Sequence, residues 1–233
     1  MNGINCEHIG IIHSPFQEKF GIPRQSGLIP QARGHIELLP PFNQPEALRG
    51  LEDFSHLWLL WLAKSEPGRR WKTTVRPPRL GGNTRVGVFA SRSIFRPNPI
   101  GQSLVRLEGI VSDAAGVHIE VSGLDILDGS PVLDLKPYLP WSDAPPPDQP
   151  FEAGYAASPP DPVLEVEFTG NLREQLRHAD AKLPELIEVV LALDPRPAFH
   201  QPGRVYHMVV SNHEIRFVVE ESRATVLSVT PKS

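Results

Sequence analysis

Apolar and polar residues alternate in short stretches along the chain as far as Trp141, with turn residues between the stretches. This period of two is typical of strands that bury one face, and its repetition at roughly ten-residue intervals without intervening helices indicates a barrel or a sandwich. One stretch, FSHLWLLWL, is almost continuously apolar, which predicts a central strand buried on both faces. We expect strands at residues 9–12, 35–39, 54–62, 85–90, 104–110, 117–121 and 132–136.

The pattern changes after a proline-rich stretch at residues 142–162, which predicts a semi-stiff linker. Leu183, Leu186, Ile187, Val190 and Leu191 then form a helical stripe that ends before Pro195. Asn171 and Glu174 resemble a capping box at the start of a shorter helix. Strands at 206–210, 215–219 and 225–229 complete a small α+β domain. We therefore predict a mainly β protein with domains at 1–141 and 163–233.

The composition limits the cellular environments and the kinds of covalent or metal site that the chain can have. Cys6 is the only cysteine, which excludes an intrachain disulfide and a cysteine metal cluster. His8 and His13 lack an obvious third ligand, so no metal site is predicted. No signal peptide is visible, and the longest apolar run, Leu57 to Ala63, is too short to span a bilayer. We expect a cytoplasmic protein that does not enter membranes.

Charge is unevenly distributed. The chain carries a net charge of −4, yet the ten basic residues between Lys64 and Arg106 are accompanied by a single acid, Glu66. A local basic surface on an acidic chain suits a selective polyanion partner, although a solvated charged face is the alternative. Arg76, Arg79 and Arg96 are the expected phosphate contacts.

The stretch RVGVFASRSIFRPNPIG, from Arg85 to Gly101, combines a strand pattern with a stiff loop. Pro97 and Pro99 fix their own φ angles and favour extended conformations for the residues before them. The loop is expected to present Arg92, Arg96 and Asn98. The carboxamide of Asn98 suits the edge of an unstacked adenine, because it accepts from an exocyclic amine and donates to a ring nitrogen. A proline-terminated edge strand with solvated arginines is the alternative.

Other chemistries find less support. The Gly81-Gly82 turn is not a G-x-G-x-x-G motif followed by a helix, and no G-x-S-x-G nucleophile motif occurs. Asp125 or Asp128 can bind an amine or a ribose hydroxyl, and Arg24 with Arg92 can hold a carboxylate. Together these groups suit a zwitterionic cofactor that carries a sugar.

The chain resembles the TrmO family of S-adenosylmethionine-dependent tRNA methyltransferases, also called YaeB or TsaA-like. The resemblance covers essentially the whole chain and rests on SPFQEKFGIPRQSG, RGLEDFSHLWLLW, TVRPPRLGGNTRVGVFASRSIFRPNPIGQSLV, LDILDGSPVLDLKPYLPW and DPRPAF. It implies an antiparallel β-barrel catalytic domain, a homodimer, and methylation of N6 of threonylcarbamoyladenosine beside the anticodon in threonine tRNA. The rival hypotheses are a non-catalytic RNA- or nucleotide-binding barrel and a protein that senses S-adenosylmethionine.

The resemblance also implies a set of site residues. The methyl donor is expected to be surrounded by Pro23, Arg24, Gln25, Lys64, Arg92, Leu124, Asp125, Leu127 and Asp128. At the position of Lys64 the family often has histidine. We assign the orientation of the target nitrogen to Asn98. Arg196, in DPRP, is expected to contact the tRNA from the second domain, or else to complement the charge at the end of a helix.

Overall fold

The structure is a computed structural model that describes residues 5–63, 70–113, 116–196 and 203–232. Contacts divide the chain into two compact units. The barrel unit comprises Met1–His13, Gly34–Ser122 and Gly129–Ser158, and the C-terminal unit comprises Ser14–Arg33, Gly123–Asp128 and Pro159–Ser233. The contiguous division at 141 and 163 stays a prediction.

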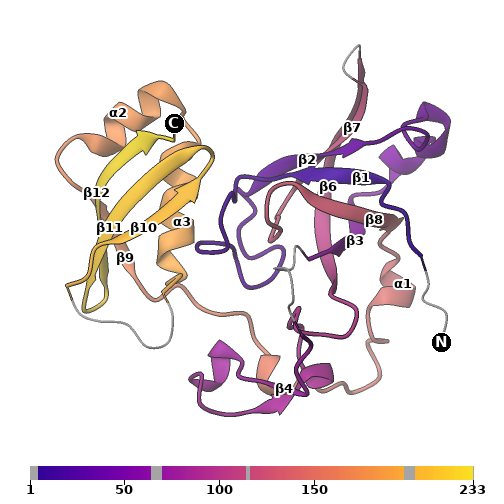
Figure 1. The fold of residues 1–233 in the computed structure, drawn as a ribbon, viewed down its shortest axis with the longest axis horizontal. Coiled ribbons are helices and arrows are strands. Elements are labelled where there is room, and N and C mark those ends of the chain that lie inside the picture. The colour runs from indigo at the N-terminus through magenta and orange to yellow at the C-terminus, as the bar shows by residue number, and fades with distance from the viewer. Residues whose placement is uncertain (1–4, 64–69, 114–115, 197–202, 233) are drawn as a thin grey trace. The chain divides into compact units, whose positions relative to one another are not determined.

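The barrel unit is built on a closed barrel in the order β1-β2-β7-β6-β3-β8 (Figure 1). The strands are β1 (Gly10–His13), β2 (Arg33–Leu38), β3 (His56–Leu62), β6 (Ile100–Asp113), β7 (Gly116–Ser122) and β8 (Ser130–Pro137). β8 pairs antiparallel with β1, which closes the barrel. Alternate residues fill the interior, among them the fully buried Ile12, Ile36, Leu57, Leu59 and Ile119. The barrel, rather than a sandwich, is therefore the arrangement that the strand pattern forms.

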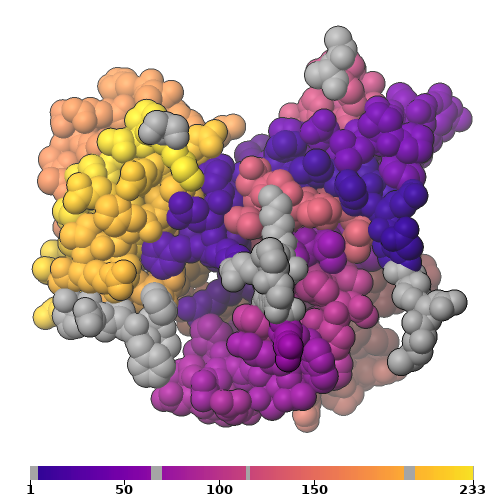
Figure 2. All heavy atoms as spheres, viewed as in Figure 1, coloured from indigo at the N-terminus to yellow at the C-terminus, as the bar shows by residue number. Residues whose placement is uncertain are grey.

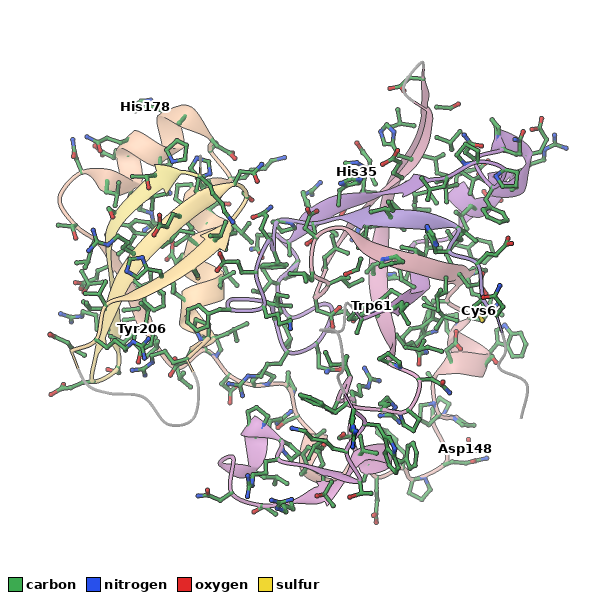
Figure 3. The ribbon with its side chains drawn as sticks, viewed as in Figure 1. Cys6, His35, Trp61, Asp148, His178 and Tyr206 are labelled. Atoms are coloured by element: carbon green, nitrogen blue, oxygen red, sulfur yellow. The ribbon has the colours of Figure 1, made fainter. Side chains whose placement is uncertain are left out.

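Strand β3 is central, because it pairs with β6 on one side and with β8 on the other. The prediction that it is buried on both faces is wrong, since its residues alternate between buried and half-exposed. The reason is the barrel itself: one face of each strand points inward and the other points out. Near the end of β3 the indole of Trp61 donates to the hydroxyl of the fully buried Ser103, and a Cβ on Gly101, which pairs with Trp61, would overlap the indole ring; Trp61 is labelled in Figure 3.

Short elements lie between β2 and β3, between β3 and β6, and after β8. They are β4 (Thr74–Val75), β5 (Val86–Gly87), the short helix α1 (Pro140–Asp143) and 3-10 turns at Pro45–Leu48, Leu51–Asp53, Pro78–Leu80, Val88–Ala90 and Gly154–Ala156. The predicted strand over 85–90 is wrong beyond Gly87. The carbonyl of Val88 accepts from the backbone and hydroxyl of Ser91 and from Arg96, which favours a tight turn over a strand.

The C-terminal unit contains a sheet in the order β10-β11-β12-β9 and two helices, α2 (Leu172–Ala179) and α3 (Leu183–Ala192). The strands are β9 (Glu165–Phe168), β10 (Tyr206–Val210), β11 (His213–Glu220) and β12 (Arg223–Pro231). Both helices and the three-strand meander were predicted. The pattern missed β9, a four-residue strand parallel to β12. The capping box is wrong, because the side chain of Asn171 makes no cap and its backbone carbonyl accepts from Glu174 instead.

The loop between β1 and β2 also packs in the C-terminal unit. Phe16 is fully buried and forms an isolated bridge with Val210, and the carbonyl of Pro15 accepts from Ser211. The ring of Phe20 stacks near the rings of Tyr206 and Phe217, with centroids 6.2 and 6.3 Å away. The loop is therefore anchored on the sheet β10–β11 rather than held by its own turns. Within the described residues no helix is long and apolar enough to cross a membrane.

Candidate functional site

Two segments that lie far apart in the sequence come together in the C-terminal unit. We call the loop Ser14–Arg33 and the turn Gly123–Asp128 the loop–turn assembly. Ser14 donates from its amide to Oδ1 of Asp128 at 2.9 Å and from its hydroxyl to the carbonyl of Ile126 at 2.6 Å. The amide of Asp128 donates to Phe16, that of Gly27 to Gly123 and that of Leu124 to Ala32. These bonds fix the turn against both ends of the loop.

Apolar packing and two glycines complete this arrangement. Leu124, Ile126 and Ile29 are at most 1% exposed. Gly27 and Gly123 adopt positive φ angles of 78° and 78°, and a Cβ on Gly123 would lie 3.3 Å from the Cα of Gly27. A side chain at Gly123 would press against the backbone of Gly27, and the positive φ angle disfavours larger residues at both positions. The sequence therefore specifies a close crossing of the two backbones.

The loop–turn assembly brings together seven of the predicted donor-binding residues. Arg24 is exposed, and Gln25 donates to the Arg24 carbonyl at 2.5 Å. Asp125, Leu127 and Asp128 are half-buried, whereas Pro23 and Leu124 are buried. These seven residues supply one exposed cation and two half-buried carboxylates. Such a mixed-charge set fits a ligand that has both an ammonium and a carboxylate.

Two predicted donor-binding residues are not part of this assembly. Lys64 lies outside the residues that the structure describes. Arg92 is exposed and belongs to the barrel unit. Their roles stay predictions.

Residues 70–99 of the barrel unit, which we call the basic segment, hold Asn98 on an exposed loop. The carbonyl of Asn98 accepts from Ile100 at 2.8 Å, and the carbonyl of Pro99 accepts from Ala63 at 2.9 Å. No described residue hydrogen-bonds the carboxamide of Asn98. The stiff loop between two prolines therefore presents this carboxamide outward, as the sequence predicted.

The cations of the basic segment differ in their surroundings. Arg76 and Arg79 are exposed, and Arg79 reaches the hydroxyl of Ser158 at 3.5 Å. Arg96 donates to the carbonyls of Val88 at 3.1 Å and Ser91 at 2.6 Å. Arg76 and Arg79 are thus open to solvent, Arg96 holds its own loop in shape, and the phosphate contacts of all three stay predictions.

Arg196 occupies a different kind of environment. Its side chain is 7% exposed and pairs with Asp194 through Nε and Nη2, at 2.8 and 2.9 Å. The hydrogen bond with Asp194 raises the pKa of Arg196 above its usual value. This pairing just beyond α3 favours a structural role, and the tRNA contact of Arg196 stays a prediction.

The sequence interpretation missed a row of histidines on the outside of the barrel. The ring of His35 on β2, which Figure 3 labels, lies between those of His13 on β1 and His118 on β7, with ring centroids 4.6 and 5.3 Å away. Burial lowers the pKa of His35 below its usual 6.5, and the nearby His13 and His118 lower this pKa further. Glu37 and Glu120 raise the pKa and offset part of this decrease. In the part of the chain that the structure describes, no group of three or more His, Cys, Asp or Glu is arranged to hold a metal ion.

The protein combines an antiparallel barrel with a small α+β part, and it carries the loop–turn assembly and the basic segment. Solved structures contain the same class of two-part protein. A crystal structure of TrmO shares 42% identity, covers 98% of this chain and 100% of its own, and superposes with a TM-score of 0.77. A second, of TrmO from Pseudomonas aeruginosa, shares 40% identity over 98% and 100% of the chains with a TM-score of 0.75.

The chain belongs to the tRNA-methyltransferase O (TrmO) family. The model of the tRNA-methyltransferase O N-terminal domain matches residues 11–144, and that of the TrmO C-terminal domain matches residues 161–232. The tRNA (adenine(37)-N6)-methyltransferase of Escherichia coli is 43% identical over 100% of both chains. A putative S-adenosylmethionine-dependent methyltransferase of Pseudomonas aeruginosa, RcsF, is 52% identical over 85% of each.

Proposed function

We propose that this protein is a tRNA methyltransferase that transfers the methyl group of S-adenosylmethionine to N6 of threonylcarbamoyladenosine at position 37 of threonine tRNA. The observation that carries the proposal is the full-length match to a curated tRNA (adenine(37)-N6)-methyltransferase, together with both family models. The exposed cations of the basic segment support an RNA substrate, because phosphate contacts dominate the affinity of such proteins.

The loop–turn assembly is the proposed donor site. Asp125 and Asp128 are assigned to the ammonium group and the ribose hydroxyls, and Arg24 to the carboxylate. Pro23, Gln25, Leu124 and Leu127 shape the surrounding surface, and Arg92 and Lys64 are further donor-binding candidates. When bound, S-adenosylmethionine supplies an electrophilic methyl group on a sulfonium.

Asn98 is the proposed orienting residue for the target base. Its carboxamide oxygen accepts from the N6–H of the adenine, which turns the nitrogen lone pair toward the incoming methyl group. Proximity and orientation supply much of the rate, up to about 7–11 kcal/mol in well-aligned systems. If the N6 proton leaves after methylation, the site requires no strong base.

Transfer of labelled methyl groups tests the proposal. The protein is incubated with methyl-labelled S-adenosylmethionine and threonine tRNA that carries threonylcarbamoyladenosine, and the tRNA is digested to nucleosides. We expect the label in a methylated threonylcarbamoyladenosine and none in the same tRNA made without that modification. Donor binding without transfer would instead support a sensor, and tRNA binding alone would support a non-catalytic module.

We also propose that the protein is a cytoplasmic homodimer, as its family resemblance implies. Light scattering of the purified protein measures the molar mass. A mass near twice the monomer's 25.8 kDa is expected, and a monomer at micromolar concentration would contradict the assembly.

A further inference from the structure

The basic segment contains an aromatic side chain, Phe89, that is largely exposed to solvent. Phe89 is 71% exposed, although it follows Val88, which is buried at 1%. Burying a phenylalanine stabilises a protein by about 1.5–3 kcal/mol, so an exposed one forgoes this gain. Folding of the chain therefore does not explain the position of Phe89.

The backbone around Phe89 is held from several sides. Arg96 donates to the carbonyls of Val88 and Ser91, and the hydroxyl of Ser91 donates to Val88 at 2.8 Å. The hydroxyl of Tyr155 donates to the carbonyl of Ala90 at 3.2 Å. The guanidinium of Arg96 also lies 5.4 Å from the centroid of the Phe89 ring. The turn is thus fixed in place while it leaves the ring open to solvent.

The segment that carries the ring is strongly cationic in its sequence. The basic segment contains no Asp or Glu, and its cations are Arg70, Lys72, Arg76, Arg79, Arg85, Arg92 and Arg96. In Figure 2 these residues fall in the purple to magenta part of the surface. An exposed aromatic ring among cations without acids is the pattern of proteins that bind unpaired nucleotides, in which cations meet phosphates and rings stack on bases.

We propose that Phe89 is a stacking platform for an unpaired nucleobase of the tRNA anticodon loop next to the target adenosine, and that Arg96 is the residue that positions it. This inference rests on the proposed function and adds a base-binding subsite to it. Every base offers a π face, so the platform holds the loop open without reading its sequence.

Charge argues against a second copy of the chain as the occupant. In a symmetric dimer centred on Phe89, the acid-free basic segment would face itself. Like charges placed opposite each other disfavour such an interface. The polyanionic backbone of RNA has the complementary charge.

Binding of modified threonine tRNA to variants of the full-length protein tests the platform. Phe89→Ala is expected to weaken tRNA binding about 5- to 50-fold, and Phe89→Trp to bind within about threefold of the wild type, since a larger ring still stacks. The slope of affinity against salt concentration stays unchanged, because no cation is removed. Affinity for S-adenosylmethionine and the melting temperature also stay unchanged.

Phe151→Ala is the matched control. Phe151 is 70% exposed in the barrel unit but has the acids Asp148 and Glu152 nearby in the sequence. Its loss is expected to leave tRNA affinity within about twofold of the wild type. An equal loss in both variants would mean that any exposed ring matters, which overturns the specific role of Phe89.

A fluorescent base provides a direct readout. 2-Aminopurine is placed in turn at each unpaired position beside the target adenosine of an anticodon stem–loop, and its quenching by the protein is measured. We expect quenching at one position with the wild type and Phe89→Trp, and its loss with Phe89→Ala. Quenching that persists in Phe89→Ala overturns the platform.

Three further outcomes separate failure of this inference from failure of the proposed function. If the wild type methylates tRNA while Phe89→Ala binds and reacts equally well, the platform alone is wrong. If light scattering shows that Phe89→Ala dissociates a dimer, a second copy covers the ring and the platform is again wrong. If the wild type transfers no methyl group to tRNA, the proposed function falls and the inference falls with it.

Discussion

The loop–turn assembly and the basic segment are both irregular, yet they are held in place by different forces. The assembly is joined by backbone hydrogen bonds over buried Leu124 and Ile126. The basic segment is held largely by polar side chains, such as Arg96 and Tyr155, that donate to backbone carbonyls. The loop–turn assembly therefore resembles a small hydrophobic core, and the basic segment resembles a surface loop held by side-chain hydrogen bonds.

The difference matches the ligands that we propose for the two regions. A small zwitterion requires partly shielded groups of both signs, which the assembly supplies in Arg24, Asp125 and Asp128. An RNA loop is large and polyanionic, and it requires exposed cations and rings. Buried side chains and backbone hydrogen bonds can hold the partly shielded groups that a small zwitterion requires. Hydrogen bonds at the surface can hold the exposed cations and rings that an RNA loop requires. Four predictions test this contrast, and a fifth concerns His35 on the barrel, which belongs to neither region.

The largest expected effect is on turnover. Asn98→Ala removes the carboxamide that we assign to the target nitrogen, and we expect kcat to fall about 100-fold, as when one oriented hydrogen-bonding group is lost from a reaction site. Single-turnover methylation measures the loss, and calorimetry should show nearly unchanged donor affinity. Asn171→Ala, whose side chain makes no helix cap, is the control. A parallel loss of donor affinity would refute the assignment of Asn98.

The affinity for S-adenosylmethionine should depend on the loop–turn assembly. Asp125→Asn removes a charge-assisted hydrogen bond, which is worth about 1.5–3 kcal/mol, so we expect S-adenosylmethionine to bind roughly 10- to 100-fold more weakly. tRNA affinity should stay the same. The exposed Asp148 provides a control as Asp148→Asn. If Asp125→Asn weakened tRNA binding instead, the division of labour between the two regions would be wrong.

The free energy of unfolding should depend more on a buried hydrogen bond in the loop–turn assembly than on a half-buried one in the basic segment. Ser14→Ala leaves the Ile126 carbonyl and the Phe16 amide without their serine partner inside the protein, which we expect to cost about 1–3 kcal/mol of unfolding free energy. Ser91→Ala also removes hydrogen bonds, but in a half-buried turn that water reaches, and should cost less than about 1 kcal/mol. Urea unfolding of both variants measures the two losses, and equal losses would contradict the contrast.

Salt dependence should identify the phosphate contacts. Arg76→Ala is expected to weaken tRNA binding a few-fold and to reduce the slope of log affinity against log salt by about 0.7–1, because one phosphate contact is lost. Arg223 lies within ion-pair distance of Glu165 and Glu167, so Arg223→Ala should leave the slope unchanged. An unchanged slope in Arg76→Ala would remove that residue from the interface.

The smallest effect concerns pH. The pKa of His35 is lower in the folded protein than its usual 6.5, so the unfolded chain binds a proton more readily. The stability that neutral His35 provides is present above about pH 6.5 and is lost as the pH falls through the folded pKa. The unfolding free energy of the wild type should therefore fall more between pH 7.5 and 5.5 than that of His35→Gln. Identical falls would contradict the prediction.

Much of this could be predicted from the sequence because it depends on local patterns. Period-two alternation predicted the barrel strands, and the apolar stripe from Leu183 to Leu191 predicted α3. Pro97 and Pro99 indicated the stiff loop that presents Asn98. These features arise from backbone sterics and from burial of one face, which operate over a few residues.

The sequence could not reveal features that depend on register or on side-chain bonds across the fold. Phe89 was assigned to a strand, because nothing in its neighbours showed that Arg96 and Ser91 would bend the backbone at Val88. The three neighbouring histidines come from strands β1, β2 and β7, and only the pairing of these strands in the barrel makes them neighbours. The capping box failed because the spacing of Asn171 and Glu174 does not fix the rotamers that form it.

By itself, the sequence determined most of the strands and both helices of the second domain, where the cations gather and which family the chain resembles. Only the tertiary structure decided that Ser14–Arg33 and Gly123–Asp128 meet, and that they do so through paired glycines over buried leucine and isoleucine side chains. The reason is physical: alternation and charge are properties of neighbouring residues, whereas a contact across a hundred residues depends on the packing of the whole chain.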